Sequence, residues 1–366
     1  SLKVPDASNS RDGLATLIYA RTFTWTIAFL NKVIAGAGDA ASGVEIGLLD
    51  IAGFECFPFN TWEQITINLS NENLQQHFND YIFKRELADY KAEGVPSDDI
   101  KFADNQEILD TIADPKPTSI MTILDGETKC IPNDNAKADK KFIDNLSKAM
   151  AAQKNAYYTP DKFGKPEFTL LHYAGYVKYD VARWVNDKNK DEPPPEAVDV
   201  LMTTTNPLLK EIATGIANED AKTKKTVSQS FRASLKSLID KIRSAQPHFV
   251  RCIKPNDEKK PSIFTKKKVL EQLTYSGVME LVKIRRQGYP YRAPPGDFLK
   301  KFRCCLPGKL RADAEKKAGK KLDSKSPDHG IMTQIMQGMA DALEVPNMKI
   351  EYQMGKTKVM IRMKGL

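Results

Sequence analysis

Residues 44–94 read VEIGLLDIAGFECFPFNTWEQITINLSNENLQQHFNDYIFKRELADYKAEG, and the rest of the chain is organised around them. The run 44–49 is apolar and rich in strand-forming residues, so it predicts a short buried strand. Asp50 ends the run, and Gly53 and Glu55 follow it. An aspartate at the tip of a buried strand can orient water bound to Mg²⁺, and a nearby glycine lets its N–H approach a terminal phosphate. The pattern Asp-x-x-Gly is short, and an ordinary turn after a strand explains most such matches.

A long helix is predicted directly after this segment. Asn60 and Glu63 have the spacing of a capping box, and no proline or glycine occurs before Gly94. At 1.5 Å per residue the helix would be a rod about 45 Å long. Such a rod can transmit a small displacement from the candidate phosphate contact at Gly53 to a distant part of the protein. The alternative is an ordinary long core helix. The apolar residues that form its one broad stripe are Trp62, Ile65, Leu69, Leu74, Phe78, Tyr81, Phe83, Leu87 and Tyr90.

Composition describes a mixed globular chain of 366 residues, of which 41% are hydrophobic, enough to bury cores in two or three subdomains. Lysine and arginine number 55 against 47 aspartates and glutamates, which gives a net charge of +8. A basic chain suits an acidic partner, either nucleic acid or an acidic filament. No signature of a DNA- or RNA-reading module accompanies the charge, so nucleic acid is disfavoured.

The sequence contains no apolar run long enough to span a membrane and no signal peptide. The five cysteines have neither zinc-site nor redox spacing, so we expect reduced thiols and a cytosolic protein. His172 lies in FTLLHYAGYVKYDVARW (168–184), where no nucleophile or acidic partner pattern surrounds it. We therefore interpret His172 as a structural histidine rather than a catalyst.

Residues 48–95 closely resemble the second phosphate switch and relay helix of myosin motors. Two further blocks agree, PHFVRCIKPN (247–256) and VLEQLTYSGVMELVKIRRQGYPYR (269–292). The resemblance covers nearly the whole chain and is weakest between residues 297 and 347. It implies an α/β fold: a partial P-loop NTPase-type motor whose central mixed sheet is incomplete in this chain, with a helical lower subdomain and a small α+β converter.

The resemblance also shows which family motifs are missing. No Gly-x-x-x-x-Gly-Lys-Ser/Thr phosphate loop occurs, the family's first phosphate switch is absent, and the first residue is Ser1. We therefore expect the later portion of a motor domain, inactive by itself because nothing in it grips the α- and β-phosphates.

For the complete motor, the resemblance implies an actin-activated ATPase with ATP and Mg²⁺ as nucleotide and metal. Asp50 would hold Mg²⁺ through water, and the Gly53 N–H would detect the γ-phosphate. Glu55 would pair with an arginine of the first switch and close the site around the attacking water. The alternative is a divergent, non-hydrolysing actin-binding relative, against which the intact Asp50, Gly53 and Glu55 argue.

Two segments are candidates for binding an actin filament. Ile120 and Met121 follow the turn 114–119, where myosins present apolar residues to actin, although the family's usual Met-Gly pair is Thr118-Ser119 here. The alternative is that both residues pack inside their own subdomain. The basic segment 213–226 lies where myosins have a mobile surface loop. Its lysines either bind actin or simply belong to a solvated loop. Its candidate residues are Lys222, Lys224 and Lys225.

Gly277 and Gly288 are candidate hinges, because they follow two short predicted helices, 269–275 and 278–286. In many myosins a reactive cysteine lies in each helix, and Tyr275 and Arg285 occupy those places here. The relay-loop tryptophan that usually touches the converter is replaced by Ser97, so this contact is expected to be made differently.

The domain map follows from these motifs. A helix over 11–34 precedes the central strand, helices are expected over 102–152, and a further amphipathic helix over 226–244. A light chain or calmodulin-like subunit is expected beyond Leu366, and an actin-associated cytoplasmic location is implied. The expected ranges are 1–60 (helix, central strand and second switch), 61–95 (relay helix), 96–212 (lower subdomain), 213–226 (basic loop), 227–292 (sheet strand and hinge helices) and 293–366 (converter).

Overall fold

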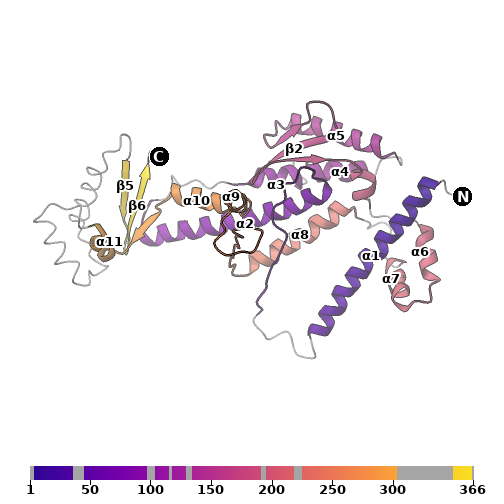
Figure 1. Ribbon diagram of the computed structural model, residues 1–366, viewed down its shortest axis with the longest axis horizontal. Helices are drawn as coiled ribbons and strands as arrows, with labels where there is room; N and C mark the ends of the chain where they lie inside the picture. Colours follow the sequence, from indigo (N-terminus) through magenta and orange to yellow (C-terminus); the bar gives the residue numbers. More distant parts are fainter. Residues whose placement is uncertain are drawn as a thin grey trace, which may run out of the picture. The chain divides into compact units, whose positions relative to one another are not determined.

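The computed structural model describes residues 4–35, 45–96, 104–114, 118–128, 134–190, 195–217, 225–302 and 349–364 (Figure 1). The chain divides into two compact units. The first comprises 1–71 with 107–246, and the second 72–106 with 247–366. None of the described helices is long and apolar enough to cross a membrane.

Helix α2 (Trp62–Glu93) is the predicted long helix, and its residues are divided between the two units after Asn71. Its first turn differs from the predicted capping box. The Thr61 N–H donates to Gln64 Oε1 at 2.9 Å, so Thr61 is the residue at the helix start. Asn60 instead accepts from the Phe57 N–H at 2.8 Å and donates to the Lys178 carbonyl at 3.0 Å, which ties the preceding turn to a strand.

The burial of α2 is broader than one apolar stripe. Trp62, Ile65, Leu69, Phe78 and Tyr90 are buried as expected. The middle of the helix also buries polar side chains, which an amphipathic pattern assigns to solvent. These side chains are Asn68, Glu72, Gln75, Gln76, His77 and Asn79.

The first unit contains a three-stranded antiparallel sheet covered by helices. Its strands are β1 (Tyr158–Pro160), β2 (Glu167–His172) and β3 (Gly175–Asp180), in the order β1-β2-β3. Phe168 pairs with Tyr179, and both are buried. Strands β2 and β3 thus form an antiparallel hairpin within 168–184. The helices around the sheet are α3 (Gln106–Ile112), α4 (Ile120–Thr128), α5 (Asn135–Ala152) and the π-helical turn Trp184–Lys188.

Three further helices of this unit pack around Leu17. Helix α1 (Val4–Ala35) contains the helix expected over 11–34, and its Leu17 packs with Leu201 of α6 (Pro195–Met202) and Ala213 of α7 (Pro207–Ala217). Because α7 continues to Ala217, the first part of the expected loop 213–226 is helical. Helix α8 (Val227–Ser244) confirms the amphipathic helix, and Thr226 caps it in a complete capping box with Gln229.

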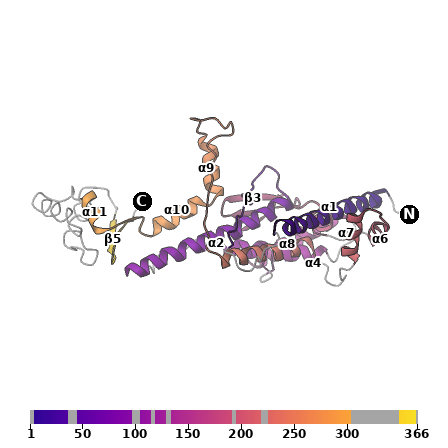
Figure 2. The same cartoon turned by 90° about the horizontal axis from the view of Figure 1, so that it is seen from below.

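The second unit contains the remaining helices and a second sheet. Helices α9 (Lys266–Tyr275) and α10 (Val278–Gln287) are the two expected short helices, and the chain changes direction between them (Figure 2). After α10 come β4 (Tyr291–Ala293), α11 (Pro295–Phe302), β5 (Lys349–Met354) and β6 (Val359–Lys364). The strands form an antiparallel sheet in the order β4-β6-β5.

Two predicted strands are wrong for this chain. Residues 45–50 carry no regular strand structure, and Ile46 and Leu48 are 87% and 97% exposed. Residues 247–256, which contain the other expected sheet strand, are also irregular, with Val250 exposed. A strand exists through its ladder of hydrogen bonds to a neighbour. Among the described residues, no strand pairs with either segment, so an apolar run with strand-forming composition stays unpaired.

Candidate functional site

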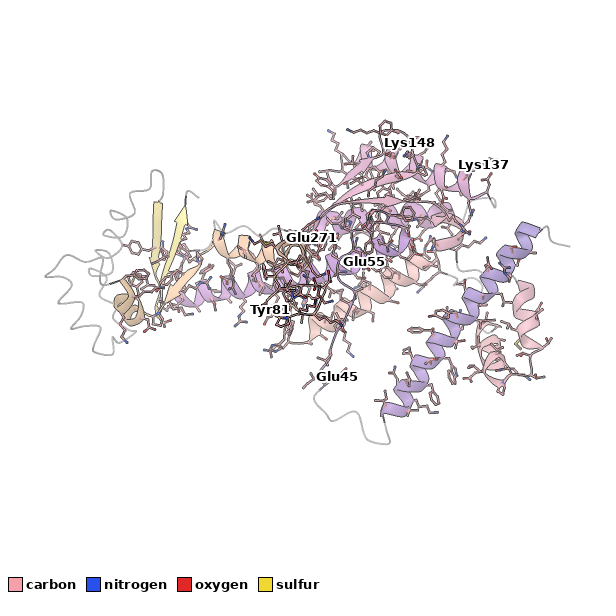
Figure 3. All side chains as sticks on the ribbon, in the orientation of Figure 1. Glu45, Glu55, Tyr81, Lys137, Lys148 and Glu271 are labelled. Carbon is pink, nitrogen blue, oxygen red and sulfur yellow. The ribbon has the colours of Figure 1, made fainter. Side chains whose placement is uncertain are left out.

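The segment 50–55 lies on the surface of the first unit, on the irregular stretch whose ends are marked by Glu45 and Glu55 in Figure 3. Asp50 and Gly53 are exposed and Glu55 is half-buried, whereas Phe54 between them is buried. The three residues expected to face a nucleotide are thus accessible, while the segment is held to the unit through Phe54.

The backbone of this segment is bound by two asparagines of α2. The Glu55 N–H donates to Asn68 Oδ1 and the Glu55 carbonyl accepts from Asn68 Nδ2, both at 2.8 Å. One turn further along α2, Asn71 Nδ2 donates to the Ala52 carbonyl at 3.0 Å. These amides bind backbone groups with which no strand of the described chain pairs. Neither asparagine was predicted to contact this segment, because nothing in the pattern of a helix shows which loop its amides contact.

The β2–β3 hairpin contacts the same segment. The Phe54 ring packs edge-on against His172 and Tyr173, with ring centroids 5.2 and 5.3 Å apart. His172 is buried, and its Nε2 lies 2.9 Å from the Tyr179 hydroxyl. This agrees with a structural role for His172.

Glu55 and Gly53 leave room for groups from outside the described residues. The nearest polar partner of the Glu55 carboxylate is Gln64, whose Nε2 lies 3.3 Å away, and no lysine or arginine of the described chain forms an ion pair with it. A Cβ built on Gly53 would have no atom within 4 Å. The segment therefore has open space at Gly53 and a carboxylate available to a cation.

The segment 50–55 can supply only part of a Mg²⁺ site. The described residues contain no group of three His, Cys, Asp or Glu side chains that could hold a metal. Mg²⁺ in nucleotide sites is held by one or two carboxylates, retained waters and phosphate oxygens. The exposed Asp50 suits the first of these contributions, a single carboxylate acting through water.

The structure contradicts an actin contact by Ile120 and Met121. Both side chains are 0% exposed at the start of α4, together with Leu124. This face of α4 packs on α5, α8 and the Trp184–Lys188 turn. Because the apolar face of a short amphipathic helix fills the core, the alternative of internal packing applies, and these side chains are not available to a partner.

The basic loop is attached to α4 at its C-terminal end. Asp125 of α4 is buried and accepts from the hydroxyls of Thr226 and Ser228, from Asn189 Nδ2 at 3.2 Å and from Arg232 at 2.5 Å. A buried carboxylate with this many donors fixes the start of α8.

Lys225, which directly precedes this anchor, is exposed. Lys222 and Lys224 lie outside the described residues, as does Ser97. The expected lysine cluster is therefore described at one position only.

The two candidate hinge glycines both lie against α2. Gly277 has a φ of +72°, which favours glycine, and a Cβ built there would overlap the Gln75 side chain. A Cβ on Gly288 would overlap the Tyr90 hydroxyl. Close approach to α2 explains why both positions are glycine, and whether they also act as hinges stays a prediction.

The C-terminal end of α2 binds the second sheet through Arg292. Arg292 of β4 pairs with Glu86, lies 3.5 Å from Asp89, and donates to the Tyr90 hydroxyl at 2.9 Å. Burial acts to lower the pKa of Arg292, but the hydrogen bond to Glu86 and the negative charges around it raise the pKa above its usual range.

Glu93 forms a second contact between α2 and this sheet. Its carboxylate accepts from the Thr357 N–H at 2.7 Å, from the Lys358 N–H at 3.2 Å and from the Thr357 hydroxyl, in the turn between β5 and β6. Burial acts to raise the pKa of Glu93, but these hydrogen bonds outweigh it and lower the pKa. This contact is therefore made by the last residue of α2 itself.

Comparison with known proteins places these features in a family. The family model described as "Myosin head (motor domain)" matches residues 1–362. "Protein OPAQUE1" of Zea mays is 34% identical over 359 residues, which cover 97% of this chain and 22% of that protein. "Myosin-11" of Arabidopsis thaliana is 35% identical (99% and 22% covered), and "Myosin-I heavy chain" of Dictyostelium discoideum is 36% identical (99% and 14% covered). The chain thus spans about a fifth of the length of Protein OPAQUE1 and of Myosin-11.

Proposed function

The chain belongs to the myosin head (motor domain) family, and we propose that the whole protein couples MgATP hydrolysis to movement along actin filaments. The observation that carries the proposal is the segment 50–55. It exposes Asp50 and Gly53 and leaves Glu55 half-buried, while its backbone is fixed by α2. Phosphoryl transfer requires this kind of exposed but rigidly held polar segment, because its catalysis is mainly positioning and charge stabilisation.

The proposed roles follow from the chemistry of each group. Asp50 binds water on Mg²⁺, which supplies the positive charge that offsets the phosphate oxygens. The Gly53 N–H donates to the γ-phosphate, since the open space beside this residue admits it. Glu55 pairs with an arginine contributed by a part of the whole protein outside this chain, and so encloses the attacking water.

Helix α2 is proposed to carry the state of this segment to the second sheet. Its N-terminal part holds Ala52 and Glu55, and its C-terminal residue Glu93 holds the 355–358 turn. A helix without internal glycine or proline resists bending, so a displacement at one end is passed to the other. Tyr90 and Glu93 thereby take the place of the tryptophan that Ser97 replaces in the sequence.

Actin binding is proposed to involve the basic loop that contains Lys222, Lys224 and Lys225. Lys225 is exposed beside the Asp125 anchor, so a force on the loop would reach α4 and α8. The net charge of +8 favours an acidic filament surface. A light chain beyond Leu366 and an actin-associated cytoplasmic location remain part of the same proposal.

The test is phosphate release by the whole protein with MgATP, measured with and without actin filaments. The proposal expects turnover that actin accelerates, and no turnover above a protein-free control from residues 1–366 alone. Actin binding by the whole protein without any turnover would identify the non-hydrolysing alternative. Turnover by the isolated chain would show that the roles given to Asp50, Gly53 and Glu55 are incomplete.

A further inference from the structure

The peptide of Glu55 is clamped by a single side chain. The amide of Asn68 accepts from the Glu55 N–H and donates to the Glu55 carbonyl, both at 2.8 Å, and Asn68 is 0% exposed. Because both backbone groups flanking the Glu55 Cα are fixed, the backbone cannot rotate there without breaking two buried hydrogen bonds. The Glu55 carboxylate is then free to move only through its own side-chain torsions.

Asn68 is itself held from the other side by the β2–β3 sheet. Its Nδ2 donates a second hydrogen to the Tyr179 hydroxyl at 2.9 Å, and Tyr179 is buried. With this oxygen accepting from Asn68, the Tyr179 proton can be donated to His172 Nε2, 2.9 Å away. His172 also packs against Phe54, next to Glu55. This series of contacts therefore begins and ends in the segment 50–55. Its members are, in order, Glu55, Asn68, Tyr179, His172 and Phe54.

We propose that Asn68 and Tyr179 are positioning residues, which hold the Glu55 peptide so that its carboxylate stays in the geometry that hydrolysis needs. This inference rests on the proposed function, and it adds the β2–β3 sheet as the element that sets the position of Glu55. Misplacement of a reacting or positioning group by about 1 Å costs on the order of 100-fold in rate, so a clamp of this kind has a measurable effect.

The decisive variant is Tyr179→Phe in the whole protein, which removes one hydroxyl and keeps the ring. Its matched control is Tyr158→Phe. Tyr158 is also a buried tyrosine of the same sheet, but its hydroxyl pairs with Ser147 at 2.9 Å and has no contact with the 50–55 segment among the interactions that the structure describes. Asn68→Ala serves as a second variant, which removes the clamp itself.

Two measurements separate positioning from general stability. One is the single-turnover rate of ATP hydrolysis, read together with the rate of ATP binding. The other is hydrogen exchange of the Glu55 amide, which needs no nucleotide. Tyr179→Phe is expected to lower hydrolysis and to accelerate this exchange, each roughly 5-fold, without changing ATP binding, while Tyr158→Phe changes neither. Asn68→Ala, if folded, is expected to lower hydrolysis on the order of 100-fold.

Three outcomes overturn parts of this reasoning in different ways. If the wild-type protein hydrolyses ATP and Tyr179→Phe matches Tyr158→Phe in both measurements, the positioning role is refuted and the proposed function stands. If Glu55 exchange rises and hydrolysis does not, the clamp exists but does not position a reacting group. If the wild type does not hydrolyse ATP, the proposed function is refuted together with the positioning role, and exchange alone still reports the clamp.

Discussion

Changing Glu93 should loosen the turn between β5 and β6. Glu93→Gln keeps the shape of the side chain and removes its charge, while Glu93→Ala removes every acceptor. In the native chain two backbone N–H groups, of Thr357 and Lys358, and the Thr357 hydroxyl donate to this carboxylate. Both variants test whether the last turn of α2 holds the second sheet through one carboxylate.

The size of the effect follows from these hydrogen bonds. A hydrogen bond to a charged group contributes about 1.5–3 kcal/mol and a neutral one about 1 kcal/mol. Glu93→Gln retains the acceptor oxygen, so the local free energy of opening should fall by about 1–2 kcal/mol. Glu93→Ala leaves the N–H donors without this partner, and we expect a loss of about 3 kcal/mol.

Hydrogen exchange of the Thr357 and Lys358 amides measures this local free energy directly. A loss of 1.4 kcal/mol accelerates exchange about tenfold when exchange proceeds through local opening. Asp80→Asn is the matched control. Asp80 lies on the same helix and pairs with Lys84 at 3.2 Å, but the pair is exposed and contributes about 0.3–0.5 kcal/mol. Tryptophan fluorescence should not change, because Trp25, Trp62 and Trp184 all belong to the first unit.

The lowered pKa of Glu93 adds a pH dependence of known sign. A carboxylate whose pKa is lower in the folded protein contributes stability above its ordinary pKa of about 4.5, and loses it as pH falls through the folded value. The ratio of exchange rates between Glu93→Gln and wild type, compared at each pH, should therefore be largest near pH 7 and shrink below pH 4.5. A ratio near one at pH 7, or one that grows on acidification, would refute the assigned contact.

The remaining predictions concern the expected site, the glycines and the basic loop. Gly53→Ala should leave folding stability unchanged, because a Cβ there meets no atom within 4 Å, but it should lower turnover of the whole protein with ATP binding retained; unchanged filament gliding would contradict the role of Gly53. Gly277→Ala should destabilise the protein by about 2 kcal/mol or more, because of the positive φ of Gly277 and its contact with Gln75. Gly126→Ala in α4, where a Cβ has open space, should stabilise it by up to about 1 kcal/mol. Equal unfolding midpoints for the two variants would contradict this. Replacing Lys222, Lys224 and Lys225 with alanine should weaken actin affinity at low salt and flatten its salt dependence, because exposed charges are screened within about 8 Å at physiological ionic strength; unchanged affinity at low salt would favour a merely solvated loop.

Local patterns predicted the elements whose stability is local. The helix from Trp62 to Glu93 follows from its apolar spacing and from the residues that end it, and the two short helices are separated at Gly277. The same patterns failed where a neighbour decides the outcome. Residues 45–50 have strand composition, yet a strand needs a partner, and none pairs with them among the described residues.

Burial of individual side chains was the second point at which the sequence was insufficient. Ile120 and Met121 occupy positions that resemble a partner-binding turn, but the core face of α4 includes both of them. Gln75 and Asn79 carry the composition of an exposed helix surface, yet both are buried, and Gln75 Nε2 donates to Asn79 Oδ1 at 2.8 Å. A helix can be buried on more than one face, depending on what packs against it. The apolar pattern of its sequence identifies only one of these faces.

The polar interior of α2 has a physical consequence for the proposed function. An apolar helix face can slide against its neighbours at little cost, because the hydrophobic effect is non-directional. The amides of Asn68 and Asn71 and the carboxylate of Glu93 instead bind particular backbone groups at fixed distances. Asn68 and Glu93 are buried, and leaving a buried polar group without a partner costs about 1–3 kcal/mol, so intermediate positions are disfavoured. A helix anchored by directional bonds at both ends therefore has few discrete positions, which is the property that the role proposed for α2 requires.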